Sequence, residues 1–324
     1  MMDLEEIFEL YRPQLEIVED RLRELFKSPV FPIQLIGKHL IDGGGKRLRP
    51  LILILSAELA GCRGDERLTL AGIIESIHTA SLLHDDVVDG AEIRRGKAPA
   101  HSIWGNQVVI LVGDYLYSNA LRLAVMQKSQ RIMETLSEAT TKMTEGEILQ
   151  LVKIGDPNIT EEEYLEIISA KTAVLISAAC RIGAILGSLP EYKEGALARF
   201  GMKMGIAFQM ADDILDYMAE EDELGKRLGK DLNEGKLTIP IISLLKVAQD
   251  MEKEEVKGII KSKLKKRGLK RIQKLFMKYH IIENSLKQAH TQVADAKNEL
   301  AVFSDSPEKE ALKKIADYIL VRGK

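Results

Sequence analysis

Apolar residues recur at three- and four-residue intervals along most of the chain, which is the repeat of an amphipathic helix. "DLEEIFELYRPQLEIVEDRLRELFK" shows this repeat on both sides of Pro13. "RPLILILSAELAG" has a proline in its first turn and ends at Gly61, and "TEEEYLEIISAKTAVLISAACRIGAILG" begins with Thr160 as a cap. No segment alternates for long enough to indicate a strand, although "NQVVILVGD" is ambiguous. The pattern predicts an all-α fold.

Two segments are apolar around nearly their whole circumference, which is typical of buried central helices. They are "LTLAGIIESIHTASLLHDDVVD" and "EGALARFGMKMGIAFQMADDILDYMA". From about Met251 the helices become lysine-rich and strongly amphipathic, so we expect them to pack on the core with one solvated face. No low-complexity linker divides the chain. We therefore predict one domain over residues 1–324 that includes the helices after residue 251.

Composition excludes some classes of protein. The 46 Lys and Arg residues balance 49 Asp and Glu residues to a net charge of −3, so the chain lacks the basic footprint of a nucleic-acid-binding protein. Cys62 and Cys180 lie far apart in apolar surroundings and match no metal or redox spacing, which fits a reduced, cytoplasmic setting. No apolar run reaches about 18 residues, and the acidic N-terminus does not resemble a secretory signal.

The two apolar helices end in the same pattern, Asp-Asp-x-x-Asp. "HDDVVDG" and "ADDILDY" place three carboxylates each on about one helical turn, at Asp85, Asp86 and Asp89 and at Asp212, Asp213 and Asp216. Such carboxylates repel one another unless a cation lies between them, and oxygen ligands suit magnesium. Magnesium in proteins usually keeps substrate phosphates among its ligands. Because the helices are apolar, we expect their acidic ends to line a cavity that holds a metal-bridged diphosphate.

A cationic segment supplies the opposite charge. "DGGGKRLRP" lacks the spacing of a P-loop, but it brings Lys46, Arg47 and Arg49 to the start of a helix, where anions bind well. Further cations are Arg94, Arg95, Lys226 and Lys236. We expect one phosphate group to be bound by cations directly and another through magnesium. The apolar helix between them predicts a substrate with a diphosphate head and a hydrocarbon tail.

Several motifs are shared with a known family. "GGGKRLRP", "LLHDDVVD" with "RRG", "GDYLYSNA", "AKTAVL", "GIAFQMADDILDY" and "GKDLNEGKLTIP" follow one another between about Leu35 and Pro240. In these motifs and their order the chain resembles the all-trans polyprenyl diphosphate synthases. The resemblance implies the isoprenoid synthase fold, a large helical bundle around a central cavity, and a homodimer. It also implies a trans-prenyltransferase that joins isopentenyl diphosphate to an allylic diphosphate by ionisation, condensation and elimination.

The resemblance assigns roles to individual residues. Isopentenyl diphosphate would be bound by Lys46, Arg49, His78 and Arg95. Three magnesium ions would be held against the allylic diphosphate by Asp85, Asp86, Asp89, Asp212, Asp213 and Asp216. The allylic diphosphate would also contact Arg94, Lys171, Lys226 and Lys236. The developing allylic cation would lie near Lys171, Thr172 and Gln209.

The residues one turn before Asp85 bear on product length. If this helix lines the tail pocket, Ala80 and Ser81 face the growing chain and Ile77 lies a turn further down. In the family, bulky residues here form the floor of the pocket and keep the product short. Small residues let the tail run about 5.4 Å deeper for each helical turn. We therefore predict a medium-to-long product, octaprenyl-like. A geranylgeranyl or farnesyl diphosphate synthase is the alternative, and peripheral membrane association for product release stays open.

Three rival functions fit the sequence less well. A ferritin-type bundle needs two Glu-x-x-His motifs, and the chain has only Glu75 to His78. A terpene cyclase normally carries an Asn/Ser/Glu pattern in its second cluster and has no need of "GGGKRLRP". A non-catalytic subunit of a heteromeric prenyl synthase would be expected to lose aspartates, and this chain keeps all six.

Overall fold

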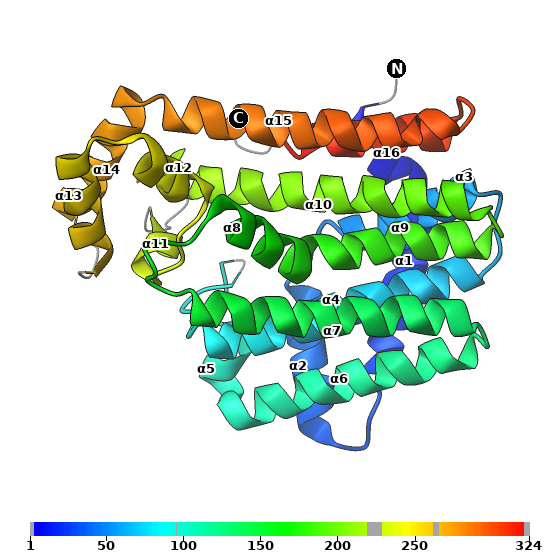
Figure 1. The fold of residues 1–324 in the computed structure, drawn as a ribbon. Coiled ribbons are helices and arrows are strands. Elements are labelled where there is room, and N and C mark those ends of the chain that lie inside the picture. The colour runs from blue at the N-terminus through cyan, green and yellow to red at the C-terminus, as the bar shows by residue number, and fades with distance from the viewer. Residues whose placement is uncertain (1–2, 95, 219–228, 262–265, 321–324) are drawn as a thin grey trace. The chain divides into compact units, whose positions relative to one another are not determined.

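The computed structural model describes residues 3–94, 96–218, 229–261 and 266–320. Within these ranges the elements are helices, with a single β-bridge between Arg94 and Lys97 (Figure 1). The ambiguous "NQVVILVGD" begins α6 (Asn106–Met126). The prediction of an all-α fold is confirmed.

The chain divides into two compact units. The first comprises Met1–Thr140, Leu175–Ala198 and Val302–Lys314, and the second comprises Thr141–Val174, Arg199–Ala301 and Ile315–Lys324.

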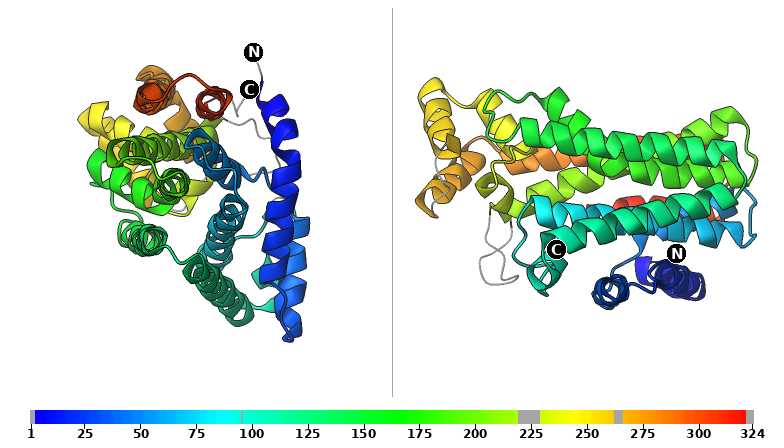
Figure 2. Two further views of the ribbon diagram at one scale, coloured as in Figure 1. Left: turned by 90° about the vertical axis from the view of Figure 1, so that its right-hand side faces the viewer. Right: turned by 90° about the horizontal axis from the view of Figure 1, so that it is seen from below.

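The first unit is built around α4 (Glu66–Val88), whose side chains are buried almost without a break from Arg67 to Ala80. The helices α1 (Leu4–Leu25), α3 (Leu48–Leu59) and α6 pack against α4, and α1 crosses the other three (Figure 2). The unit also contains α2 (Phe31–Asp42), α5 (Ala100–Trp104) and parts of α7 (Gln130–Val152), α9 (Val174–Leu186), α10 (Glu191–Met218) and α16 (Pro307–Tyr318). The apolar segment before Asp85 is therefore the central helix that the sequence predicts.

Local signals account for the ends of α1. Asp3 accepts a hydrogen bond from the backbone of Glu6, whose carboxylate accepts one from the backbone of Asp3, which is a capping box. Pro13 lies inside this helix without ending it, on an exposed position. The periodic segments on either side of Pro13 therefore form one helix.

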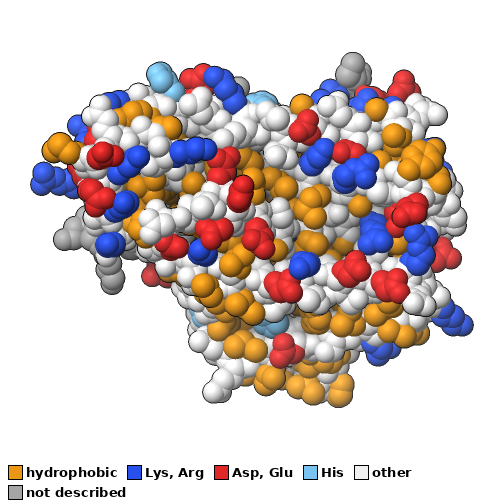
Figure 3. Space-filling view, viewed as in Figure 1, with side chains coloured by type: hydrophobic (Ala, Val, Ile, Leu, Met, Phe, Trp, Pro, Cys, Tyr) orange, Lys and Arg blue, Asp and Glu red, His pale blue; other side chains and the backbone are white. Residues whose placement is uncertain are grey.

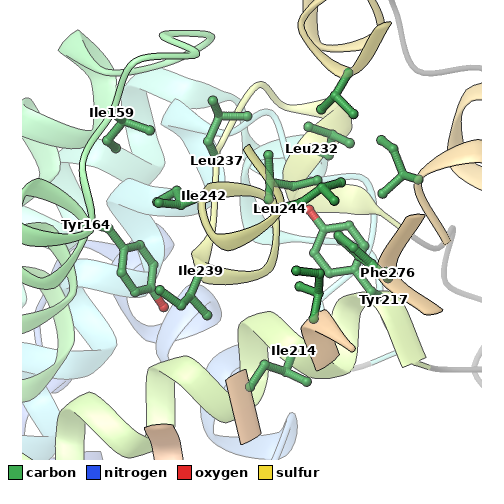
Figure 4. Close-up of a cluster of buried hydrophobic side chains, with 14 of the residues drawn as sticks. Ile159, Tyr164, Ile214, Tyr217, Leu232, Leu237, Ile239, Ile242, Leu244 and Phe276 are labelled. Atoms are coloured by element: carbon green, nitrogen blue, oxygen red, sulfur yellow. The ribbon is translucent and has the colours of Figure 1, made fainter. Parts of the chain in front are cut away.

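The second unit contains the remaining helices. They are the second part of α7, α8 (Glu161–Ile168), the π-turn η1 (Ser169–Ala173), most of α10, α11 (Lys230–Asn233), α12 (Ile239–Val247), α13 (Asp250–Lys261), α14 (Lys266–Lys278), α15 (Ile281–Glu299), the 3-10 turn η2 (Leu300–Val302), whose last residue belongs to the first unit, and the end of α16 from Ile315. Thr160 caps the start of α8, as the sequence predicts, and it forms a capping box with Glu163. A hydrophobic cluster joins α8, α10, α11, α12 and α14 (Figure 4).

The π-turn η1 interrupts the long apolar segment after Thr160. Two glycines permit neighbouring helices to approach it closely. A Cβ atom on Gly146 of α7 would lie 2.8 Å from the backbone nitrogen of Lys171, and one on Gly205 of α10 would lie 2.5 Å from the Cα atom of Ala173. The widened turn that carries Lys171 and Thr172 is therefore enclosed by two helices, in the kind of setting where π-turns often serve a site.

Two helices are long and apolar enough to span a membrane by length and composition alone, Asn106–Met126 and Glu161–Leu186. The second is 67% buried within the protein, as expected for a core helix. The first is α6, which packs against α4 and is 33% buried.

Candidate functional site

The first aspartate cluster lies at the C-terminal end of α4. Asp85 and Asp86 are in the last turn, and Asp89 is the C-cap residue. Asp86 is 3% exposed and accepts a hydrogen bond of 2.8 Å from Nε of Arg94. Arg94 is held in place by paired backbone hydrogen bonds with Lys97. The structure thus joins Asp86 and Arg94, two residues that the sequence assigned to the same diphosphate.

The glycine-rich segment turns sharply before α3. Gly44 and Arg47 both adopt the left-handed conformation, with φ of 67° and 49°, which is unusual for a residue with a side chain. Arg47 is 7% exposed, and its guanidinium donates to Glu75 at 2.9 Å and to Glu19 at 3.0 Å. Two nitrogens of the Arg47 guanidinium therefore fix the turn on α1 and α4, and its grouping with the phosphate-binding cations stays a prediction.

The neighbouring cations have different surroundings. Lys46 is exposed, and Nη1 of Arg49 lies 3.0 Å from Nε2 of His78. His78 and Glu75 are three residues apart on α4 and therefore share a face. One face of α4 thus holds Arg47 through Glu75 and contacts Arg49 through His78.

A cavity of the first unit connects these features. It is lined by the glycine segment, α4 and the segment after α4, through Gly43, Arg47, Glu75, Thr79, Leu82, Asp86, Arg94, Lys97 and six apolar or histidine neighbours. Asp86 of the first aspartate cluster and Arg47 of the glycine-rich turn therefore line one cavity.

The second aspartate cluster lies near the end of α10. Asp213 is 4% exposed and accepts hydrogen bonds from the Tyr164 hydroxyl at 2.7 Å and from Nε2 of Gln209 at 2.8 Å. The other end of the Gln209 amide, Oε1, accepts a 2.8 Å hydrogen bond from the Thr172 hydroxyl. A chain of hydrogen bonds therefore runs from Thr172 in η1 through Gln209 to Asp213.

Asp216 is bound by backbone rather than by side chains. Its carboxylate accepts hydrogen bonds from the amides of Lys230 and Asp231, both at 3.1 Å. Burial raises the pKa values of Asp213 and Asp216. Burial and then repulsion from Asp216 raise the pKa of Asp231 to about 7. Ionisation of these carboxyl groups is therefore disfavoured unless a cation lies nearby.

The carboxylates of the second cluster can be compared with the ligands that a divalent cation prefers. Among the residues that the structure describes, no three His, Cys, Asp or Glu side chains are gathered in a ligating arrangement. The chemistry of the donors fits nevertheless, because oxygen ligands are those that magnesium and calcium prefer and a cation would relieve the repulsion. The second cluster is therefore suited to a hard cation.

The predicted lysines differ in how they are held. Nζ of Lys171 lies 2.8 Å from Glu147 and 2.9 Å from Gln150, both on α7. Lys236 forms an ion pair of 2.9 Å with Glu234. The predicted residues Arg95 and Lys226 lie outside the described residues.

The residues assigned to the tail pocket are mostly packed. Ala80 and Ile77 are fully buried, and Ala80 lies in a hydrophobic cluster with side chains of α1, α2, α5 and α6. Ser81 is half-buried, and its hydroxyl donates to the backbone oxygen of His78.

Sequence reasoning missed several residues of the site. Tyr164 and Asp231 are in contact with the second cluster, and Glu75 and Glu19 fix the cationic turn. Asp231 lies in the quoted motif "GKDLNEGKLTIP", so that motif was a usable signal. Tyr164 lies in an ordinary amphipathic helix and has no such signal.

The all-helical fold and the two aspartate clusters, each with one buried carboxylate, define a protein of the isoprenoid synthase class. The profile of one family, polyprenyl synthetase, matches residues 32–276. The chain is 37% identical to octaprenyl diphosphate synthase of Escherichia coli over the full length of both proteins. It is also 37% identical to a short chain isoprenyl diphosphate synthase of Methanothermobacter thermautotrophicus, over 98% of this chain and 99% of that one.

A solved structure gives the same result. The chain matches a polyprenyl synthase from Caulobacter crescentus, crystallised with calcium and isoprenyl diphosphate, with a TM-score of 0.92 and 38% identity. The match covers 99% of this chain and 98% of that one. The chain therefore belongs to the polyprenyl synthetase family and is an enzyme of the prenyltransferase type.

Proposed function

We propose that the protein is a magnesium-dependent trans-prenyltransferase that joins isopentenyl diphosphate to an allylic diphosphate and makes a medium-to-long polyprenyl diphosphate. The observation that carries the proposal is the hydrogen-bonded chain from Thr172 through Gln209 to Asp213. It places two neutral oxygen-bearing side chains beside a carboxylate suited to a cation, as a reaction that separates a carbocation from a diphosphate requires.

Each diphosphate is assigned its own set of residues. Isopentenyl diphosphate is assigned to Lys46, Arg49, His78 and Arg95, and the contact between Arg49 and His78 supports that grouping. The allylic diphosphate is assigned to Arg94, Lys171, Lys226 and Lys236 together with the aspartates. When bound by Asp85, Asp86, Asp89, Asp212, Asp213 and Asp216, three magnesium ions would supply neutralisation of the leaving diphosphate.

The protein's own side chains have definite tasks in this mechanism. Lys171 stabilises negative charge on the departing oxygens, and Glu147 and Gln150 hold its ammonium group in position. Gln209 is oriented by donating to Asp213, so that its carbonyl oxygen lies beside the Thr172 hydroxyl and both oxygens can stabilise the allylic cation. Apolar helices exclude water, which would otherwise quench the cation. The proton lost in elimination goes to the released diphosphate.

Product length is the finer part of the proposal. Relatives named for octaprenyl and for short products have the same 37% identity, so identity does not decide between them. We assign an octaprenyl-like product because Ala80 and Ser81 are small and lie one turn before Asp85 on α4. The hydrocarbon tail would run along this helix past Ile77.

A homodimer is supported by one face of α6. This helix packs against α4, yet its other face exposes large apolar side chains, among them Ile110, Leu111, Val125 and Met126. Figure 3 shows hydrophobic side chains gathered over α6 at the lower edge of the molecule. Apolar patches of this kind usually mark an interface, so we assign this face to a second copy of the chain.

The cellular location is also a proposal. We place the enzyme in the cytoplasm as one functional domain of 324 residues, with peripheral membrane association for product release. Two free cysteines, of which Cys180 is buried, agree with a reducing compartment.

The decisive experiment is product analysis. The purified protein is incubated with magnesium, labelled isopentenyl diphosphate and allylic primers of increasing length, and the dephosphorylated products are sized by mass spectrometry. We expect a series that ends well beyond geranylgeranyl. A series ending at farnesyl or geranylgeranyl would keep the chemistry and refute the assigned length. No elongation with any primer would indicate a non-catalytic subunit.

The pocket assignment has its own test. Ala80→Tyr should shorten the product, because a bulky side chain one turn before Asp85 blocks the path of the tail. Ser81→Phe tests the neighbouring position, which is not fully packed. Thermal unfolding of both variants controls for damage to the core around Ala80. An unchanged product series in two folded variants would exclude α4 as the floor of the pocket.

A further inference from the structure

The helix α14 carries a concentration of positive charge that the reaction does not use. Between residues 257 and 278 the sequence has ten Lys and Arg residues and no Asp or Glu, although the whole chain carries −3. The rest of the chain is therefore clearly acidic.

These charges are ordered along one face of α14. Arg267, Lys270, Lys274, Met277 and Lys278 are all exposed and recur at helical spacing, and we call them the basic stripe. Arg267, Lys270 and Lys274 pair with no carboxylate among the residues that the structure describes, whereas Lys278 pairs with Glu252. Met277 is 70% exposed and adds an apolar side chain to the stripe.

The opposite face of α14 leads to the proposed active site. Ile272, Leu275 and Phe276 are buried, and the Phe276 ring packs edge-on against Tyr217 with centroids 5.2 Å apart (Figure 4). Tyr217 follows Asp216 directly in α10. A helix with its side chains is about 10–12 Å across, so only one helix separates the basic stripe from the residue next to the second aspartate cluster.

We propose that the basic stripe of α14 docks the enzyme on a membrane surface that contains anionic lipids. Juxtaposed Lys and Arg side chains are attracted to anionic headgroups, and an apolar residue among them enters the interface. The acidic remainder of the chain is repelled, so this end of the second unit approaches the surface. The stripe has no aromatic side chain for stacking on bases, which favours a membrane over RNA.

The benefit of docking rests on the proposed function. A long polyprenyl diphosphate is poorly compatible with water, and a site one helix away from the bilayer surface shortens the path of its tail into lipid. The docking itself requires no turnover, so the two proposals can fail separately.

Vesicle co-sedimentation without substrates tests the docking. We expect the protein to bind vesicles of phosphatidylcholine mixed with phosphatidylglycerol, to bind phosphatidylcholine alone far less, and to be released by salt. Removing three cations with Arg267→Gln, Lys270→Gln and Lys274→Gln should weaken binding on the order of 100-fold, at about fivefold for each cation. Glutamine preserves helix propensity, and circular dichroism checks the fold.

Two matched variants control this test. Arg12→Gln, Arg23→Gln and Lys27→Gln remove the same charge from exposed positions of the first unit and should leave binding unchanged. Exchanging lysine and arginine at 267, 270 and 274 should preserve binding. Equal binding to both kinds of vesicle, full binding by the glutamine variant, an equal loss in the first-unit control, or preference for poly(U) over vesicles would each overturn the proposal.

Turnover separates the docking from the proposed function. The glutamine variant should keep its activity on substrates dispersed in detergent, because the basic stripe is on the face of α14 away from Tyr217. A wild-type protein that binds vesicles without elongating any primer would refute the function and retain the docking.

Discussion

The two aspartate clusters have the same sequence spacing but are stabilised in different ways. In the first, Asp86 is paired with the positive charge of Arg94. In the second, the hydrogen-bond donors to Asp213 are a phenol and an amide, and those to Asp216 are backbone amides. Opposite charge neutralises a carboxylate, whereas neutral donors only solvate it.

The same Asp-Asp-x-x-Asp motif therefore lies in two different electrostatic environments, and the two environments should bind a cation differently. Where Arg94 is present, a metal has to compete with or displace an existing ion pair. Around Asp213, Asp216 and Asp231 the pKa values are raised by burial, so the site is short of positive charge before any substrate arrives. We infer that the second cluster gains more from binding a cation than Asp86 does.

The largest expected effects are on turnover. Asp86→Asn and Asp213→Asn should each lower kcat by on the order of 100- to 1000-fold, since each removes a carboxylate assigned to hold the magnesium that neutralises the departing diphosphate. Steady-state assays with saturating substrates measure this. Glu92→Gln, at an exposed position just after the first cluster, is the matched control and should retain activity. If only one aspartate variant loses activity, the clusters are not partners in one reaction.

Loss of an ionic partner should lower the unfolding free energy more than loss of a neutral hydrogen-bond donor. Glu75→Gln removes one of the two carboxylates that pair with the buried Arg47 guanidinium, and it should lower the unfolding free energy by about 3 kcal/mol. Tyr164→Phe removes a neutral donor from Asp213 and should cost only about 1 kcal/mol, because the carboxyl can take up a proton. Urea unfolding gives both values.

The control for this pair of variants is an exposed ion pair. Glu24→Gln breaks the surface contact with Lys27 and should change the unfolding free energy by less than about 1 kcal/mol. Equal losses in Glu75→Gln and Tyr164→Phe would show that charge and neutral donors support the two regions alike.

The fold was largely predictable because helical periodicity is a local property. Thr160 caps α8 and Asp85 ends an apolar helix, and both follow from neighbouring residues. The π-turn at Ser169–Ala173 did not follow, because it is enclosed by Gly146 and Gly205 of other helices.

The site was predictable in its charges but less so in their pairing. Arg47 and Arg49 are two residues apart, yet the left-handed turn at Arg47 buries one guanidinium against Glu75 and brings the other to His78. Tyr164 meets Asp213 across 49 positions of sequence, a separation at which periodicity carries no information.

A smaller effect should come from the hydrogen-bonded chain. Thr172→Val removes the hydroxyl that donates to Gln209 and should lower kcat about tenfold, as expected for a group that orients a neighbour. Thr135→Val is the matched control, since this buried threonine donates only to the backbone of its own helix. A loss in kcat without a change in stability would place Thr172 in the reaction. Equal behaviour of both variants would place it in the fold.

The smallest effect concerns pH in the absence of metal. The pKa of Asp231 rises from its ordinary value of 3.8 to about 7 on folding, so its stabilising contribution is complete below 3.8 and is lost as the pH rises through 7. In chelator, the unfolding free energy should therefore fall by about 1 kcal/mol between pH 6 and pH 7. Asp231→Asn should abolish this pH dependence. The control Asp250→Asn, at an exposed position, should retain it. Magnesium should flatten the wild-type slope, because a cation favours the ionised form. If the slope of unfolding free energy against pH persists in Asp231→Asn, other carboxyl groups cause it. The proposed difference between the two aspartate clusters would then be weaker.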